Sequence, residues 1–308
     1  MKTIIITGGT SGLGLALAKK LMQKNNRVII AGRNETKMNE IKKQLEEESN
    51  NELLTTLFMD LTSFKTIRNA VAGLQYAPNV LVCNAAVAYE TSARFTTDGF
   101  EETFQVNYLS HFLLTHLILK KYAASLTKIV MVASNAHDPA KTKGFFPSPQ
   151  FTSFSEMAFE QLPYYTNTHK QGALRYVHSK LCDILFTYEL HKRLSKEQGY
   201  DAVKINAYHP GFIPTTGISR ETSALNQFIL KYIMPPMKLF FSEIVSADDA
   251  AEKMLPLIFY TPSSGKYFHG ADAIASSALS YNQELWEALW DNSIEWVKLT
   301  KEETIFSL

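Results

Sequence analysis

Short runs of apolar residues alternate with longer stretches of mixed polarity along most of this chain. A short apolar run bounded by turn residues is typical of a strand that is buried on both faces of a sheet. We therefore predict strands over residues 3–7, 28–31, 53–59, 80–83, 128–133 and 203–208.

The stretches between these runs carry apolar residues at helical spacing, as Leu13, Leu17 and Leu21 do after the first run. They predict helices over residues 12–24, 35–48, 63–74, 98–121 and 173–194. Strands that alternate with helices form a parallel sheet covered on both faces, because each parallel connection must cross the sheet. Right-handed crossovers then give a doubly wound, Rossmann-type α/β fold, and we expect residues 1–308 to form a single domain.

Two stretches break this rhythm, residues 137–172 and residues 212–245. We expect both to be excursions at the carboxyl edge of the sheet, on the side where a substrate binds. The apolar segment 229–241 has three interpretations: a lid over an apolar substrate, a patch that touches a membrane surface, or ordinary core. Its position after the sixth strand favours the lid. Aromatic residues of the first excursion could line the same pocket, which predicts a bulky apolar substrate: Phe145, Phe146, Tyr164 and Tyr165.

Composition and charge narrow the class of protein. The chain has 308 residues, of which 45% are hydrophobic and 20% charged, as in globular proteins. A net charge of +1 gives no electrostatic argument for nucleic-acid binding. The two cysteines have neither disulfide nor metal-ligand spacing, so we expect no metal site. The run Ile4–Ile6 is too short for a signal peptide and no run is long enough to span a membrane, so we expect a cytoplasmic protein.

A glycine-rich turn follows the first predicted strand, with Gly8, Gly12 and Gly14 around Ser11. Glycine allows the tight turn and lets backbone N–H groups approach a pyrophosphate, while the next helix points its positive end at the same anion. The cluster alone could be only a turn. Its place between a strand and a helix is the context that a dinucleotide site requires, and Ser11 could add a hydroxyl donor.

The second predicted strand ends at Arg33, where sites for NAD usually carry an acidic residue. A guanidinium at this place suits the 2′-phosphate of NADP. The alternative is that Arg33 is an ordinary solvated charge. We expect NADP(H) as the cofactor, with NAD(H) the less favoured alternative.

Further motifs follow the later strands in order. They are Asp60-Leu61, Asn84-Ala85-Ala86, Asn107 within Val106-Asn107-Tyr108, Ser134, Tyr176-Val177-His178-Ser179-Lys180 and His209-Pro210-Gly211. Together with the glycine turn they resemble the short-chain dehydrogenase/reductase family over almost the whole chain. The likeness is greatest to its retinol dehydrogenase and light-dependent protochlorophyllide reductase branches.

The resemblance implies a catalytic set of Asn107, Ser134, Tyr176 and Lys180. Tyr176 and Lys180 are four residues apart on a predicted helix, so they share one face, and a nearby ammonium favours the ionised phenol. Tyr176 is then the general acid or base, Ser134 binds the substrate oxygen, Lys180 also binds the nicotinamide ribose, and Asn107 anchors a water-linked proton relay. The cofactor residues that the loop and the resemblance imply are Gly8, Ser11, Gly12, Leu13, Gly14, Arg33, Asp60, Leu61, Asn84, Ala85, Tyr176, Lys180, Pro210, Gly211 and Ile213.

Three functions remain open. The first is hydride transfer between NADPH and a carbonyl or alcohol group of a bulky apolar substrate. The second is light-driven C=C reduction of protochlorophyllide, although Phe212 stands where that branch carries a cysteine, and a phenyl ring cannot donate a proton. The third is a non-catalytic dinucleotide sensor or scaffold. The resemblance also allows a homodimer through the two long helices, unless the excursions block it.

Overall fold

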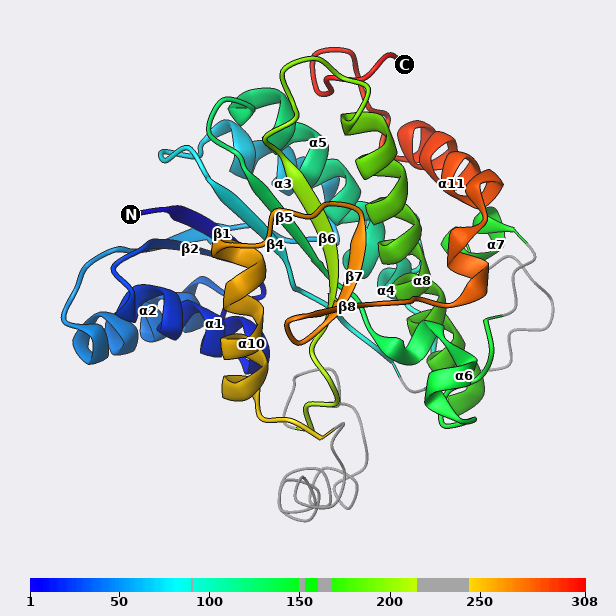
Figure 1. The fold of residues 1–308 in the computed structure, drawn as a ribbon, viewed down its shortest axis with the longest axis horizontal. Coiled ribbons are helices and arrows are strands. Elements are labelled where there is room, and N and C mark those ends of the chain that lie inside the picture. The colour runs from blue at the N-terminus through cyan, green and yellow to red at the C-terminus, as the bar shows by residue number, and fades with distance from the viewer. Residues whose placement is uncertain (90, 150–152, 160–167, 215–243) are drawn as a thin grey trace.

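A computed structural model describes residues 1–89, 91–149, 153–159, 168–214 and 244–308. Its centre is one sheet of eight strands in the order β3-β2-β1-β4-β5-β6-β7-β8 (Figure 1). All neighbouring strands are parallel except β7 and β8, which are antiparallel. The strands are β1 Thr3–Thr7, β2 Arg27–Gly32, β3 Leu54–Phe58, β4 Val80–Cys83, β5 Lys128–Val132, β6 Lys204–His209, β7 Lys266–His269 and β8 Asp272–Ile274.

The first six strands confirm the predicted ones to within a residue or two at each end. The sequence did not predict β7 and β8. The short strand β7 begins with an exposed lysine, Lys266, and β8 has two exposed residues out of three, so neither has the apolar run of a central strand. Pairing with β6 creates β7, and this pairing is not visible in local sequence.

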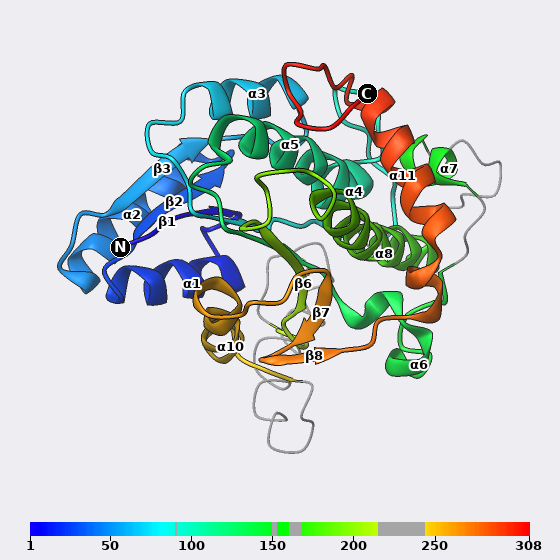
Figure 2. The same ribbon diagram turned by 45° about the horizontal axis from the view of Figure 1, so that its top comes forward.

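Helices cover both faces of the sheet. One face carries α1, α2 and α10, and the other carries α3, α5 and α8, with α11 outside α8 (Figures 1 and 2). The helices are α1 Gly12–Gln23, α2 Glu35–Ser49, α3 Phe64–Ala72, α4 Glu102–Phe104, the π-helix η1 Gln105–Leu109, α5 Ser110–Tyr122, the 3₁₀ helices η2 Asn135–His137 and η6 Ala278–Tyr281, α6 Pro139–Thr142, α7 Phe154–Phe159, α8 His169–Leu194, α10 Ala247–Phe259 and α11 Gln283–Trp296.

Alternate residues of each central strand enter the two helical layers. In β4, Leu81 packs on the side of α3, α5 and α8, while Val80 and Val82 pack on the side of α1 and α10. All three side chains are fully buried. A strand that is apolar on both sides is stable only inside such a three-layer fold, which accounts for the short apolar runs of the sequence.

The predicted helix over residues 98–121 was wrong at its start and in its geometry. Gly99 has a φ of +90°, and Phe95 and Glu101 form a β-bridge, so the helix begins only at Glu102. It then passes through the π-helix η1, which inserts an extra residue into the turn around Asn107. Irregular turns of this kind often occur at functional sites.

The C-terminal part of the chain covers α5 and α8. Trp290 of α11 packs against Phe112 and Phe186, and the Ser293 and Tyr108 hydroxyls lie 2.7 Å apart. Beyond α11, the Thr304 hydroxyl contacts Nδ1 of His116 at 2.8 Å. The side of α5 and α8 that carries these residues is therefore covered by the chain itself.

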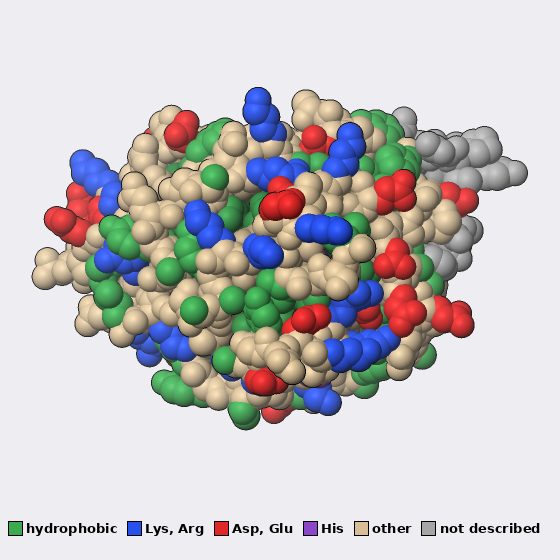
Figure 3. Space-filling model, turned by 90° about the horizontal axis from the view of Figure 1, so that it is seen from above, with side chains coloured by type: hydrophobic (Ala, Val, Ile, Leu, Met, Phe, Trp, Pro, Cys, Tyr) green, Lys and Arg blue, Asp and Glu red, His purple; other side chains and the backbone are tan. Residues whose placement is uncertain are grey.

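The excursions fall partly outside the described residues. Segment 229–241, Tyr164 and Tyr165 lie outside the described residues, whereas Phe145 and Phe146 follow α6. Among the described residues, none of the helices combines the length and apolar character needed to cross a membrane. Seen from above, acidic and basic side chains are interspersed over the surface (Figure 3).

Candidate dinucleotide and catalytic site

A cavity of about 470 Å³ opens at the carboxyl ends of β1, β2 and β4. This is where the strand order reverses direction between β1 and β4, the usual place for a ligand in a doubly wound sheet. Nine of the predicted cofactor residues line it: Gly8, Ser11, Gly12, Leu13, Arg33, Asp60, Leu61, Asn84 and Ala85.

The glycine turn has the backbone geometry that a pyrophosphate needs. Gly8 has a φ of +71°, and a Cβ placed there would lie 3.0 Å from Cα of Ala85. Gly14 lies behind the turn and does not line the cavity. A Cβ at Gly14 would come within 2.4 Å of the Gly8 carbonyl oxygen. Gly14 therefore allows α1 to pack against the turn, and Gly8 lets the turn approach the loop after β4.

Thr7 and His111, which the sequence did not single out, link the two loops beneath this cavity. The Thr7 hydroxyl accepts hydrogen bonds from the backbone N–H groups of Asn84 and Ala85, at 2.9 and 3.0 Å. It also contacts Nε2 of His111 at 2.9 Å, and Nδ1 of His111 lies 2.8 Å from the Asn107 carbonyl. Burial lowers the pKa of His111 to about 4, so the ring is neutral near pH 7. Because a carbonyl only accepts, Nδ1 donates to Asn107 and Nε2 accepts from Thr7.

Two further cations line the cavity beside Arg33. Lys37 lies in the first turn of α2, and Arg94 stacks over the Tyr89 ring with its guanidinium carbon 4.1 Å from the ring centroid. The acidic lining residue, Asp60, accepts hydrogen bonds from the backbone N–H and the hydroxyl of Thr62. The sequence analysis missed Lys37 and Arg94 because isolated basic residues give no local signal.

Asn107 joins the wall of the cavity to α8. Its side-chain oxygen accepts from the Val87 N–H at 2.7 Å, and its amide nitrogen donates to the Val87 carbonyl and to the Ser179 hydroxyl, both at 2.9 Å. Ser179 in turn donates to the Tyr176 carbonyl at 2.8 Å. The amide is 1% exposed, so these bonds fix the loop after β4 relative to the turn of α8 that carries Tyr176.

Lys180 and Tyr176 lie together, as their spacing predicted. The Lys180 nitrogen is 5.9 Å from the centroid of the Tyr176 ring. It donates to the Val132 carbonyl at 2.7 Å and to Oδ2 of Asp183 at 2.9 Å. Burial alone lowers the pKa of Lys180, but the charges of Asp183 and Tyr176 outweigh it and hold the pKa above its ordinary value. The sequence did not indicate Asp183.

Ser134 is held by the short helix η2, which packs against α8. The Ser134 hydroxyl accepts from the Ala136 N–H at 3.1 Å, and two imidazoles contact the peptide group that joins Ser134 to Asn135. His137 bonds the Ser134 carbonyl, and the Asn135 N–H donates to Nδ1 of His209 at 3.3 Å. Ser134 thus sits in a rigid turn at the end of β5.

Two aromatic residues of the excursion after β5 lie beside Tyr176. The Phe146 ring lies 6.1 Å from the Tyr176 ring, and Phe145 packs edge-on against Phe146 at 5.2 Å. The Phe145 side chain is 76% exposed. The excursion after β5 therefore brings apolar surface to the predicted general acid.

Comparison with known proteins identifies the family. A family model described as short chain dehydrogenase matches residues 2–145. Retinol dehydrogenase 13 of Mus musculus is 33% identical, and the match covers 97% of this chain and 84% of that protein. The chain belongs to the short-chain dehydrogenase/reductase family.

Further relatives of this short-chain dehydrogenase/reductase agree with the predicted branches. The chloroplastic protochlorophyllide reductase of Cucumis sativus is 30% identical over 93% of this chain and 74% of that protein. A crystal structure of a protein from Mycobacterium paratuberculosis has the same fold, with a TM-score of 0.73, 24% identity, and coverage of 100% of this chain and 96% of that one. The recognition from sequence motifs is confirmed, and the chain is an oxidoreductase of this family.

The last predicted cofactor residues of this short-chain dehydrogenase/reductase follow β6. Gly211 has a φ of +89°, which lets the chain turn sharply after Pro210. Phe212 forms a parallel bridge with Ile244, and Ile213 is buried against the layer of α1 and α10. These residues border the sheet edge but do not line the 470 Å³ cavity, so their contact with a cofactor stays a prediction.

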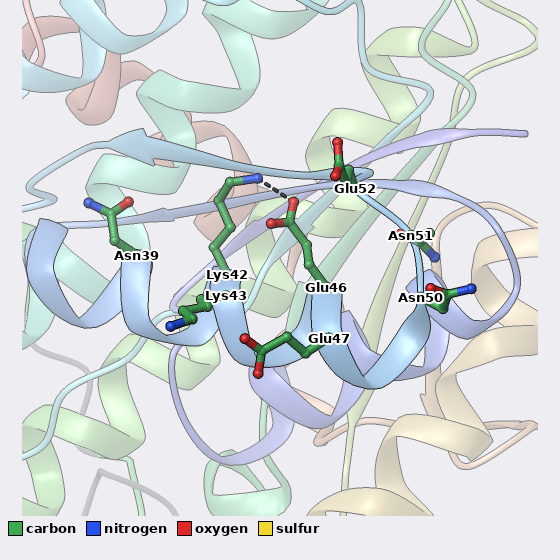
Figure 4. A pocket seen from close by; sticks show the side chains of 8 residues that line it. All are labelled: Asn39, Lys42, Lys43, Glu46, Glu47, Asn50, Asn51 and Glu52. Carbon is green, nitrogen blue, oxygen red and sulfur yellow. Dashed lines mark hydrogen bonds and ion pairs between the residues drawn. The ribbon is translucent and has the colours of Figure 1, made fainter.

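Another hollow lies on the outer side of α2 (Figure 4). Its lining is charged and polar, and Lys42 is paired with Glu46 across it. None of its lining residues belongs to the predicted site of this short-chain dehydrogenase/reductase. We therefore assign it no role in catalysis.

Proposed function

We propose that this protein transfers a hydride between NADP(H) and a carbonyl or alcohol group of a bulky, mainly apolar substrate. The observation that carries this proposal is the placement of the Lys180 ammonium 5.9 Å from the Tyr176 ring, on a helix that Asn107 ties to the dinucleotide cavity. Acid–base chemistry thereby adjoins a site whose glycine turn, donors and cations fit a dinucleotide.

Each residue has a distinct part in the proposed reaction. A bound nicotinamide would supply or accept the hydride. Tyr176 donates a proton to the carbonyl oxygen in reduction or removes it from the alcohol in oxidation. Ser134 hydrogen-bonds the same oxygen, Lys180 keeps the phenol reactive and binds the ribose, and Asn107 holds α8 against the cavity wall.

The preference for NADP(H) rests on the charge of the cavity. Arg33, Lys37 and Arg94 line it, and a 2′-phosphate would bind among such cations. The acidic lining residue, Asp60, follows β3 and does not stand at the end of β2, where sites for NAD carry the acid that binds the ribose. We propose NADP(H) for this reason.

The proposed substrate class rests on Phe145 and Phe146. Aromatic side chains beside Tyr176 favour a large apolar group on the reacting carbon. Relatives named for retinol and for protochlorophyllide support the same class.

The test is a panel of substrates under NADPH and under NADH, each in light and in darkness. The panel contains all-trans-retinal, decanal, acetophenone and pyruvate. We expect NADPH oxidation in darkness with the large apolar compounds. Preference for pyruvate would contradict the substrate class, and preference for NADH would contradict the cofactor.

A second candidate is light-driven C=C reduction of protochlorophyllide, which the cucumber relative favours. It predicts a bound pigment and NADPH use only in light. Phe212 argues against this reaction, because it replaces the cysteine of that branch and its ring cannot donate a proton. A third candidate, a dinucleotide sensor or scaffold, predicts NADPH binding without turnover of any panel compound.

A homodimer of the kind that the resemblance allows would need a surface other than the outer faces of α5 and α8. Trp290 and the C-terminal segment cover both helices. We therefore propose that any dimer of this protein leaves α11 in place and joins through another face.

A further inference from the structure

Asp183 lies one turn after Lys180 on α8, with only 1% of its side chain exposed. Its Oδ2 accepts a hydrogen bond from the Lys180 nitrogen at 2.9 Å. The same nitrogen donates to the Val132 carbonyl at 2.7 Å. Since an ammonium has three N–H donors, these two bonds leave one for the side of Tyr176 and a cofactor ribose.

Among the described residues, the Val132 carbonyl is the further hydrogen-bond partner of this ion pair. The second oxygen of Asp183, Oδ1, is buried without a hydrogen-bond partner among the residues that the structure describes. Four titratable groups face the pair from β4, η1, α5 and α8: Cys83, Tyr108, His111 and Cys182.

These four groups are all neutral near pH 7. Burial raises the pKa of both thiols and of Tyr108, and burial lowers the pKa of His111 to about 4. Burial also raises the pKa of Asp183 itself to about 6, although the Lys180 ammonium opposes this shift. The carboxylate is therefore charged at pH 7 and has Lys180 as its partner.

A buried carboxylate with one unsatisfied oxygen does little for the stability of the fold, because the loss of hydration offsets most of the attraction. We infer that Asp183 is a positioning residue for the proposed catalytic lysine. Its carboxylate fixes the Lys180 ammonium against Val132, and its negative charge offsets the positive field at Tyr176. The inference rests on the proposed function, since it assigns Asp183 a part in that same site.

The expected direction follows from the charges. Without the carboxylate, Lys180 loses its counter-ion and gives up its proton more easily. The pKa of Lys180 therefore falls, and the charged ammonium beside Tyr176 is lost at a lower pH than in the wild type.

The experiment compares Asp183→Asn with the wild type through the pH profile of kcat/KM, using NADPH and the most active carbonyl compound of the panel. Asparagine keeps the size and the hydrogen-bond acceptor but removes the charge. We expect the alkaline limb to move down by about one pH unit. An unmoved limb, or a fall by the same factor at every pH, would overturn the inference.

The matched control is Glu189→Gln. Glu189 is also a buried carboxylate on α8, but it is paired with Arg193 at 2.6 Å and not with Lys180. This variant should keep the wild-type profile. If the wild type turns over no compound of the panel, the proposed function fails, and the next measurement still tests whether Asp183 is the counter-ion of Lys180.

That measurement needs no turnover. Urea unfolding is compared for Lys180→Met and for Lys180→Met combined with Asp183→Asn. The single variant leaves Asp183 as an unpaired buried charge and should lower the urea midpoint, and the added Asp183→Asn should raise it again. If the second substitution lowers the urea midpoint further, Asp183 is not the counter-ion of Lys180 and the inference is wrong.

Discussion

Individual charges explain the proposed choice of cofactor. Arg33, Lys37 and Arg94 all line the dinucleotide cavity, and Arg94 is held over Tyr89. A side chain that is already stacked loses little freedom when it binds an anion, so Arg94 can contribute as much as Arg33.

Substitution of Arg33 tests the cofactor at this scale. Arg33→Gln should raise the KM for NADPH about tenfold, since one charge-assisted hydrogen bond is worth ~1.4 kcal/mol or more, and should leave the KM for NADH unchanged. Lys43→Gln is the control, because Lys43 faces the hollow on the outer side of α2 (Figure 4). An equal rise in the KM for NADPH and for NADH would mean that Arg33 does not bind the 2′-phosphate.

Some residues of the site could be predicted from sequence and others could not. The motifs with fixed spacing identified Asn107, Ser134, Tyr176 and Lys180. The structure holds Tyr176 and Lys180 on one face of α8 as predicted. In the sequence, Asp183 looks like the partner of an ordinary surface lysine, whereas in the folded protein its side chain is only 1% exposed. Its importance depends on burial, which local sequence does not determine.

At the scale of elements, the contact between α5 and the C-terminal segment has a measurable signature. His116 is enclosed by Phe112, Trp290 and Phe306, and burial lowers the pKa of its ring to about 3. The folded protein holds it neutral, whereas the unfolded chain protonates it below about pH 6.5. Its contribution to stability is therefore fully present above pH 6.5 and is lost as the pH falls toward 3.

The variant His116→Leu should remove this part of the pH dependence. We expect the loss of unfolding free energy between pH 7 and pH 5 to be about 2 kcal/mol smaller than in the wild type, by the linkage of proton uptake to unfolding. Urea unfolding at both pH values measures it. The exposed His169 provides the control, and His169→Leu should keep the wild-type difference. If the unfolding free energy of His116→Leu changed between pH 7 and pH 5 as much as that of the wild type, His116 would be protonated as readily in the folded protein as in the unfolded chain.

Elements with continuous apolar runs were predictable, and those created by pairing were not. The strands β1, β2, β4, β5 and β6 could be predicted because they are buried on both faces, whereas β3, at the edge of the sheet, has only Leu54 buried. The strand β7 pairs with β6, and β8 pairs with β7, while Asn107 of η1 and the adjacent His111 contact the distant residues Val87 and Thr7. Periodicity reports burial along one element, so it does not register such contacts.

At the scale of the whole molecule, the sheet gathers residues from distant parts of the chain. The turn after β1, the loop after β4, the turn after β5 and the start of α8 meet at one edge of the sheet. Hydrogen bonds join these segments in series: Thr7 to Asn84, Asn107 to Val87 and Ser179, and Lys180 to Val132. The cavity and the proposed catalytic groups therefore form one connected site.

The most direct test of this account is turnover by Tyr176→Phe, measured beside its affinity for NADPH. The account predicts that NADPH still binds while carbonyl reduction falls by about a hundredfold or more, since the general acid is gone. Wild-type turnover in this variant would contradict the assignment of Tyr176 and with it the proposed reaction.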